Sequence, residues 1–151
     1  MRAARGLVVA QFDAVTRARR WELFREAFPD IDELSVVDLG GTEEFWRHAP
    51  VRPRRVVVVS SHGTPGRVLP WLDVVIGDPT AHTGAYDAAV CDQLQDMTPE
   101  FASAVRQSAT RYWVRSASVR HADLQRLFPD AVLRRERRGG FTVSRIAAKP
   151  R

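Results

Sequence analysis

Residues 36–46 read VVDLGGTEEFW, and this stretch decides the fold. An apolar run closes on Asp38, and the glycines Gly40 and Gly41 follow almost at once. An apolar run of this length followed by glycines predicts a buried strand and then a tight turn. The next residues, 43–48, predict a short helix that the prolines after it stop. A strand, a glycine turn and a helix in this order are typical of the first unit of an open α/β sheet.

Further apolar runs downstream predict the remaining parallel strands. Four consecutive valines, residues 56–59, show no alternation with polar residues, which indicates a strand that is buried on both faces. The Gly/Pro-rich segment 63–71 is expected to be a connection that leads to the third apolar run. Three more runs predict strands, at 72–78, 86–92 and 111–118.

Three segments have the spacing of helices. Residues 13–28 carry an approximate apolar stripe, with Asp13 as the expected N-cap and Pro29 after the last turn. Residues 98–109 begin with threonine, proline and glutamate, which is a strong helix start. Residues 121–128 predict a short helix.

The C-terminal segment 130–149 predicts a hairpin of two strands around Gly139 and Gly140. Strands therefore alternate with helices until this hairpin. The order predicts an α/β, Rossmann-like open sheet in three α/β/α layers, mostly parallel with a terminal antiparallel hairpin. The whole chain, residues 1–151, is expected to be a single domain.

Composition bounds the class of protein. The chain has 151 residues, of which 44% are apolar and 27% are charged, so a disordered chain is excluded. No apolar stretch is long enough for a membrane span, and the N-terminus does not resemble a secretory signal. A single cysteine, Cys91, excludes an intramolecular disulfide and a cysteine-based zinc site. The expected location is the cytoplasm.

The basic residues are almost all arginines. The formal net charge is +5, and Lys149 is the only lysine. Because exposed aromatics and lysines do not visibly interleave with the arginines, we expect solvated faces and anion contacts, and a nucleic-acid partner is the less favoured interpretation. An arginine-rich RNA-binding module is the third hypothesis. The arginines form three groups, at 17–20, 52–55 and 134–138.

The motif at 36–46 resembles the first motif of class I S-adenosylmethionine-dependent methyltransferases, in particular small bacterial ones. The preceding helix, with its Arg-Arg-Trp-Glu-Leu-Phe sequence at 19–24, is similar to the helix before that motif. VVIGDPTAH at 74–82 is similar to the family's third strand, and YDAAVCDQLQDM at 86–97 to its fourth. The resemblance covers about residues 17–147, although only the first motif is reasonably specific.

This resemblance implies S-adenosylmethionine as the cofactor and assigns candidate positions to it. The residues after the first strand would hold the methionine end and the nearby ribose: Asp38, Gly40, Gly41 and Thr42. Ser60 or Ser61 would contact the ribose, and Asp78 would contact the adenine. Cys91–Gln93 would face the sulfonium, with Cys91 and Gln93 as its cofactor contacts.

The sequence departs from the family pattern at three places, one of which is Gln95-Asp96 after the fourth strand, where relatives commonly have Glu-His. Glu44 stands where the family usually has another glycine, and Ser60 follows the second strand where the family has an acid. For an oxygen acceptor, His82 or Asp92 would serve as a general base. The four scattered histidines and the lack of an acid cluster predict that there is no metal site.

Simpler interpretations remain open for several of these residues. Asp38 and its glycines are compatible with an ordinary strand-to-helix turn. Asp78, which precedes Pro79, is equally compatible with a turn-forming role. Cys91 lies in an apolar strand and is expected to be a small buried apolar side chain, not a nucleophile.

Two functions follow from the sequence. The first is a methyltransferase that acts on a small-molecule or secondary-metabolite acceptor. The second is a catalytically degenerate methyltransferase-like protein that serves as a partner or accessory subunit, which Glu44 and Ser60 favour. The short chain leaves little room for a substrate lid, and uncovered sheet edges hint at a homodimer or a protein partner.

Overall fold

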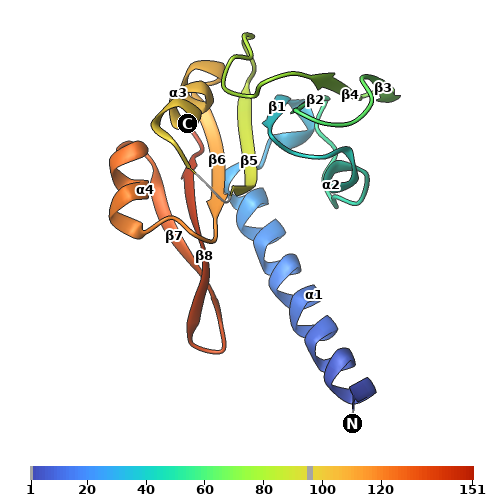
Figure 1. Ribbon diagram of the computed structural model, residues 1–151, viewed down its shortest axis with the longest axis vertical. Coiled ribbons are helices and arrows are strands. Elements are labelled where there is room, and N and C mark those ends of the chain that lie inside the picture. Colours follow the sequence, from blue (N-terminus) through green and yellow to red (C-terminus); the bar gives the residue numbers. More distant parts are fainter. Residues whose placement is uncertain (1, 95–96) are drawn as a thin grey trace.

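The computed structural model describes residues 2–94 and 97–151, with side chains described for 14–92 and 97–151. One eight-stranded sheet runs through this part of the chain (Figure 1). Its spatial order is β3-β4-β2-β1-β5-β6-β8-β7. The strands span Ser35–Leu39 (β1), Arg55–Ser60 (β2), Gly66–Leu69 (β3), Leu72–Ile76 (β4), Ala88–Leu94 (β5), Arg111–Ser116 (β6), Val132–Arg138 (β7) and Phe141–Lys149 (β8).

The five central strands are parallel. Val36 of β1 lies opposite Val56 of β2 and Ala88 of β5, so the strand that carries the first motif occupies the middle of the sheet. The connection from β1 runs to β2 on one side, and β5 lies on the other. The carboxyl end of β1 is therefore the point at which the strand order reverses, where open α/β sheets bind their ligands.

Helices cover both faces of the sheet. Helices α1 (Arg2–Ala27) and α2 (Glu43–Arg47) pack on one face, where Phe24, Phe28 and Trp46 are buried. Helices α3 (Pro99–Ser108) and α4 (His121–Leu127) pack on the other. A 3₁₀ turn at Ile31–Glu33 connects α1 to β1. This confirms the predicted three-layer α/β/α architecture with a mostly parallel sheet.

Three local expectations are wrong. The first helix begins at Arg2, so Asp13 lies within it and is not its N-cap. The connection 63–71 contains the edge strand β3, which pairs with β4 in antiparallel orientation. The sheet accordingly has a second antiparallel element besides the predicted terminal hairpin. A four-residue strand with two largely exposed residues leaves too short a pattern to recognise in a Gly/Pro-rich sequence.

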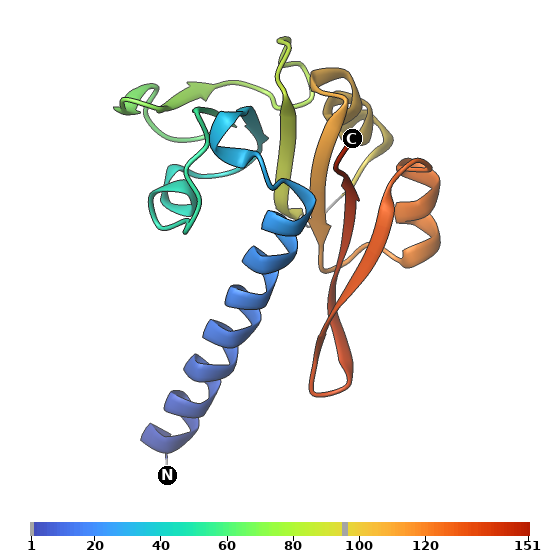
Figure 2. The same cartoon turned by 180° about the vertical axis from the view of Figure 1, so that it is seen from behind.

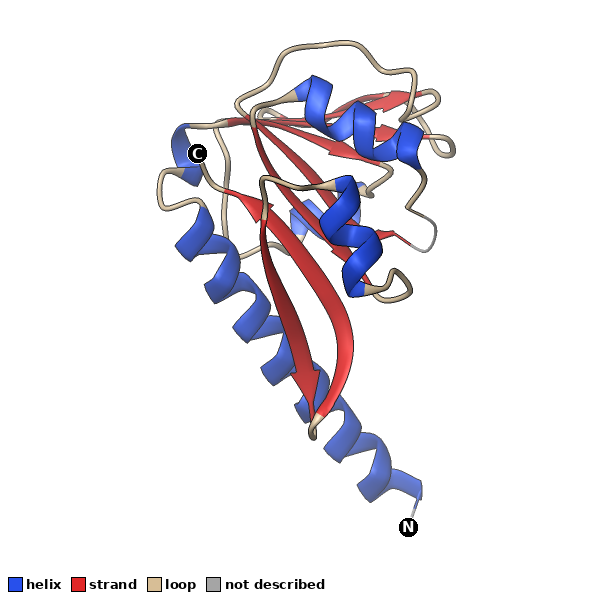
Figure 3. Ribbon diagram, turned by 90° about the vertical axis from the view of Figure 1, so that its left-hand side faces the viewer, coloured by secondary structure: helices blue, strands red, loops and turns tan. Residues whose placement is uncertain are grey.

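Two elements extend past the carboxyl edge of the parallel strands. Ser116, the last residue of β6, pairs with Arg145 of β8, so residues 141–144 and the turn before them lie beyond β6. The N-terminal half of α1 projects on the same side (Figures 1 and 2). Figure 3 shows the β7–β8 hairpin and α1 running along this side of the molecule. None of the described helices has both the length and the hydropathy that crossing a membrane requires.

Candidate ligand site at the carboxyl ends of β1 and β2

Asp38 is a buried acid at the carboxyl end of β1. Its side chain is 1% exposed, on the face of the sheet that α2 covers. The indole N–H of Trp46 donates a hydrogen bond of 2.8 Å to Oδ2. Oδ1 is buried too, and no donor among the described residues reaches it. Because a buried carboxylate without partners is costly, this oxygen marks a position where a ligand donor would be favourable.

The surroundings of Asp38 favour its neutral form. Burial raises the pKa of the carboxyl group to about 7, the Trp46 hydrogen bond opposes this rise, and the charge of Asp92 adds to it. A cationic or N–H donor placed against Oδ1 would stabilise the ionised form instead. The site is thus suited to a positively charged ligand group.

The glycine turn brings the backbone directly against this carboxylate. Gly40 has a positive φ of 81°, which few other residues adopt, and its N–H donates to the carbonyl of Val59. A Cβ at Gly41 would overlap the Asp38 carboxyl group. Both glycines are therefore required by the geometry: Gly40 for its backbone conformation, and Gly41 because the Asp38 carboxyl group already occupies the place of a Cβ.

The next residues cap the short helix α2. The Thr42 hydroxyl accepts a hydrogen bond from the N–H of Phe45 at 3.4 Å. Glu43 and Glu44 pair along the helix with Arg47 and His48, at 3.9 and 3.1 Å respectively. The Glu44 side chain is 69% exposed, so its carboxylate is directed into solvent and has the His48 ring beside it.

An open groove of about 540 Å³ lies between the glycine turn and the segment that follows β2. This volume falls in the usual range for small-molecule sites. Ser60 lies at the end of β2, where its hydroxyl donates to the carbonyl of His62 at 2.8 Å. Ser61 hydrogen-bonds to the His62 ring and does not line the groove. The lining includes Gly41, Thr42, Glu43, Arg47, Ser60 and His62.

Asp78 forms a turn after β4. Its Oδ1 accepts hydrogen bonds from the N–H and the hydroxyl of Thr80, at 2.9 and 2.7 Å. These hydrogen bonds lower the pKa of the exposed carboxyl group. The preceding Gly77 donates its N–H to the carbonyl of Ser60 at 2.9 Å, which places this turn beside the end of β2.

Cys91 and Gln93 belong to β5. The Cys91 side chain is fully buried against α3, and its thiol donates to the carbonyl of Leu39. Burial raises the pKa of this thiol well above its ordinary value. The prediction of a buried apolar cysteine is confirmed. The backbone of Gln93 lies in β5, but its side chain is outside the described residues.

His82 lies away from the groove. Its Nε2 is 2.8 Å from the hydroxyl of Tyr86, and the two rings stack. Tyr86 donates its N–H to the carbonyl of Ser108 and lies two residues before β5, at the amino edge of the sheet. The structure thus places this candidate base next to Tyr86, and His82 does not line the groove.

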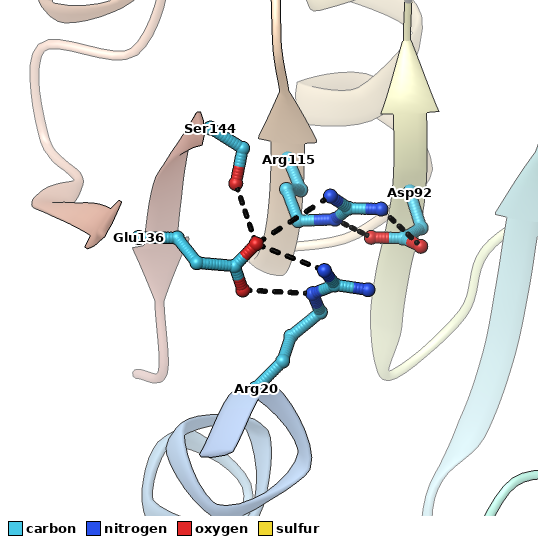
Figure 4. Close-up of polar contacts among 5 residues, drawn as sticks. All are labelled: Arg20, Asp92, Arg115, Glu136 and Ser144. Carbon is cyan, nitrogen blue, oxygen red and sulfur yellow. Dashed lines mark hydrogen bonds and ion pairs between the residues drawn. The ribbon is translucent and has the colours of Figure 1, made fainter. Parts of the chain in front are cut away.

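Asp92 belongs to a buried network of charges (Figure 4). Arg115 of β6 donates to both of its oxygens, at 2.5 and 3.1 Å. Arg115 also lies 3.8 Å from Glu136 of β7, and Arg20 of α1 donates two hydrogen bonds of 2.8 Å to Glu136. The Ser144 hydroxyl donates to Glu136 as well. The network joins α1 to the carboxyl ends of β5 and β6.

The charges within this network are matched. Burial alone would raise the pKa of Glu136, but hydrogen bonds from Arg20 and Ser144 and the charge of Arg115 hold it below its ordinary value. The cavity beside Asp92, under α1, encloses only about 10 Å³, which is room for about one water molecule. Asp92 therefore has no room beside it for an organic ligand, and both of its oxygens already accept hydrogen bonds.

Sequence reasoning missed the partners of both acids. Trp46 lies eight residues after Asp38, on the helix that the glycine turn leads into, so a short strand–turn–helix unit contained a usable signal. Asp92 lies 23 residues before its partner Arg115, and the Arg20–Glu136 pair that continues the network spans 116 residues, so no local signal indicated these contacts.

The strand order, the glycine turn after the central strand and the two helical layers form a fold that solved methyltransferase structures share. The magnesium protoporphyrin IX methyltransferase ChlM of Synechocystis PCC 6803, with bound SAH, superposes with a TM-score of 0.64 at 14% identity, over 92% of this chain and 81% of its own. The N-methyltransferase NodS of Bradyrhizobium japonicum WM9 gives 0.63 at 10% identity, over 90% and 96%. The DhpI–SAH complex gives 0.61 at 13% identity, over 93% and 85%.

Sequence comparison adds no nearer relative. No protein-family model matches the chain, and no curated protein matches it by sequence. At these identities the structural similarity establishes the fold. Within the described residues, no group of three or more histidine, cysteine or acidic side chains is arranged to hold a metal ion.

Proposed function

We propose that this protein binds S-adenosylmethionine at the carboxyl ends of β1 and β2 and transfers its methyl group. The observation that carries the proposal is the buried Asp38 carboxyl group, whose free oxygen lies at the strand-order reversal beside a glycine turn. A buried carboxylate oxygen without a donor, beside a turn whose glycines let the backbone approach closely, is what a ligand with an ammonium group requires.

Four residues would hold the cofactor. Asp38 would accept hydrogen bonds from its ammonium group, and the turn at Gly40 and Gly41 would let it approach the backbone closely. Ser60, which lines the same groove, would contact the ribose. The bound cofactor supplies a methyl group that its sulfonium already activates, so the chain's main task is to position donor and acceptor in line.

Asp92 would support this chemistry without acting as a base. Both of its oxygens accept hydrogen bonds from Arg115, and its side chain is 8% exposed. We therefore propose a positioning role for it, in which the charge network fixes α1 against the end of β5. The predicted base His82 would serve only after a rearrangement that brings it from Tyr86 to the carboxyl edge.

The acceptor that the sequence predicts is a small molecule, and this stays a prediction. The cavity of about 10 Å³ beside Asp92 is too small for an organic acceptor. An acceptor atom would instead reach the methyl group from outside the sheet edge.

Calorimetric titration of the purified chain with S-adenosylhomocysteine tests the proposal. We expect micromolar binding, with an Asp38→Asn variant that binds at least tenfold more weakly because the ammonium loses its charged partner. An absence of heat at millimolar ligand would contradict cofactor binding and therefore the methyltransferase function.

A specific observation favours the second function, an accessory subunit without cofactor. Ser60 stands where the family has an acid, and its hydroxyl already donates a hydrogen bond to a backbone carbonyl. The end of β5 is closed by ion pairs between oppositely charged side chains. This function predicts no binding of S-adenosylhomocysteine. It also predicts a dimer or hetero-complex, whose mass light scattering of the purified protein and of its co-purified complex measures.

A further inference from the structure

The net charge of the chain is concentrated in one hairpin. Residues 132–149 contain six basic residues and one acid, a net charge of +5, which equals the formal net charge of the entire chain. The remaining residues are balanced, with 17 basic and 17 acidic side chains. The basic character of this protein is therefore a property of the β7–β8 hairpin.

Three arginines of this hairpin have no acidic partner. Arg134, Arg135 and Arg137 are exposed, and within the described part of the chain no carboxylate lies within salt-bridge distance of them. The one acid among them, Glu136, is already matched by Arg20 and Arg115. The positive potential of the three arginines is thus uncompensated. By contrast, the exposed Arg19 on α1, Arg55 on β2 and Arg126 on α4 each pair with an acid.

These arginines line a groove. A hollow of about 510 Å³ lies between α1 and β7, and its lining contains all three arginines together with Arg19 and the apolar side chains of Val15 and Leu23. β7 is the edge strand of the sheet, so its outer side faces no further strand. The lining, four arginines with one acid, Glu136, and two apolar side chains, is mainly cationic and suits a charged chain with flat apolar groups.

An exposed aromatic ring completes the surface. Phe141, directly after the turn at Gly139 and Gly140, is 79% exposed, and Val143 beside it is 36% exposed. Sequence analysis disfavoured a nucleic-acid partner because no exposed aromatic accompanied the arginines. The structure supplies that ring at the tip of the most basic element.

From this combination we infer that the groove between α1 and β7, with the hairpin tip, binds single-stranded RNA. The arginines would contact consecutive phosphates and Phe141 would stack on an unpaired base. The hairpin and the N-terminal half of α1 both project past the carboxyl edge of the sheet (Figures 1 and 3), which is the edge that also carries the candidate cofactor site. The surface does not depend on the proposed function. Its position makes RNA the acceptor class to test against the predicted small molecule.

Fluorescence anisotropy of a labelled 12-nucleotide oligouridylate with the full chain tests the inference. We expect dissociation constants between about 1 and 100 µM in low salt. Three phosphate contacts on a single strand predict a slope of about −2 for the logarithm of the binding constant against that of the salt concentration. The variant with Arg134→Gln, Arg135→Gln and Arg137→Gln should bind at least tenfold more weakly and lose most of the slope. Arg52→Gln, an exposed arginine that faces Trp71 far from the hairpin, is the matched control and should change neither.

The aromatic contact has its own test. Phe141→Ser should weaken binding about tenfold and leave the salt slope unchanged, because stacking is not an ionic contact. Val132→Ser, a change at an exposed apolar residue of the same strand pair but at its opposite end, should have no effect. All of these side chains are exposed, so circular dichroism of the variants should match the wild type.

Three results would overturn the inference: no binding to the oligonucleotide in 20 mM salt, unchanged binding by the triple variant, or tighter binding to a 12-base-pair RNA duplex. If the protein sediments with phosphatidylserine vesicles and does not bind RNA, the surface is a membrane-binding one, and the inference is overturned too. The probe contains no cofactor, so failure here is distinct from failure of the calorimetric test.

Discussion

Asp38 and Asp92 are buried acids at the ends of adjacent strands, on the same face of the sheet, yet their surroundings differ. Asp38 receives one hydrogen bond and leaves one oxygen without a donor beside an open groove. Asp92 receives two hydrogen bonds from Arg115 in a region with almost no free volume. The carboxyl end of β1, at Asp38, therefore lacks a hydrogen-bond donor, and we call it the incomplete half of the edge. The carboxyl end of β5, at Asp92, has its hydrogen-bond donors, and we call it the complete half. The incomplete half is where a ligand would add free energy, and the complete half fixes the walls of the site.

Breaking the complete half should have the largest effect. Arg115→Met removes the cation that faces both Asp92 and Glu136, and a buried pair broken on one side usually costs about 3–5 kcal/mol. Urea denaturation should show a loss of this size in the free energy of unfolding. Adding Asp92→Leu should restore much of the loss, because well-packed apolar replacements of buried ion pairs are close to neutral.

An exposed pair provides the control for the network. Arg120→Met removes an ion pair with Asp123 in which the arginine is 84% exposed, and it should change the free energy of unfolding by less than about 1 kcal/mol. Equal losses for the Arg115 and Arg120 variants would show that the network does not stabilise the fold.

Removing the charge of the incomplete half should stabilise the protein in a pH-dependent way. Burial raises the pKa of Asp38 to about 7 in the folded state from an ordinary value of 3.8, so the folded state keeps a proton that the unfolded chain has lost. Stability therefore falls as the pH rises from about 4 to about 7. Asp38→Asn keeps an oxygen for Trp46 and cannot ionise. It should match the wild type near pH 4 and exceed it at pH 8 by up to about 4 kcal/mol.

Asp130 gives the opposite sign and serves as the control. Hydrogen bonds from Lys149 and Tyr112 lower its pKa to about 2, so its contribution is present above about pH 4 and is lost as the pH falls toward 2. Asp130→Asn should therefore be less stable than the wild type at pH 8. Urea denaturation at pH 4 and pH 8 measures both variants, and a pH-independent difference for Asp38→Asn would refute the assigned environment.

The glycine turn should show a smaller effect on stability and a large one on binding. Gly41→Ala places a Cβ onto the Asp38 carboxyl group, which is held by Trp46 and has little freedom to move. We expect a loss of about 1–3 kcal/mol in the free energy of unfolding, as for other overpacked sites, and loss of S-adenosylhomocysteine binding. Gly77→Ala, where a Cβ meets no atom within 4 Å, should leave both unchanged. Identical behaviour of the two variants would contradict the close approach at Gly41.

The sequence predicted the incomplete half better than the complete half, for a physical reason. Asp38, the glycines and the helix that follows are contiguous, and each obeys a local rule: a buried strand, a positive φ and an N-cap at Thr42. The sheet core was also predictable, because an uninterrupted run of valines is typical of a strand that is buried on both faces.

The complete half depends on contacts between distant parts of the chain. Asp92 looked like a base because the family resemblance placed it at the active edge, while its partner Arg115 lies 23 residues away in sequence, and Glu136, which Arg115 also contacts, lies 44 residues away. The hairpin arginines were visible as a cluster, but only the structure shows that Glu136 is withdrawn from them and that Phe141 is exposed. Side-chain partnerships across a sheet leave no local pattern to read.

The smallest expected effect concerns Ser60, the last residue of β2. Ser60 lines the groove but offers only a neutral hydroxyl, which already donates to His62. Ser60→Asp places a carboxylate there, and because charge-assisted hydrogen bonds are about twice as strong as neutral ones, it should tighten S-adenosylhomocysteine binding about tenfold. Ser61→Asp adds the same charge outside the lining and should leave the affinity unchanged. A gain confined to Ser60→Asp would show that the groove between β1 and β2 holds the ribose. Equal gains from both variants would show that general charge and not this groove determines the affinity.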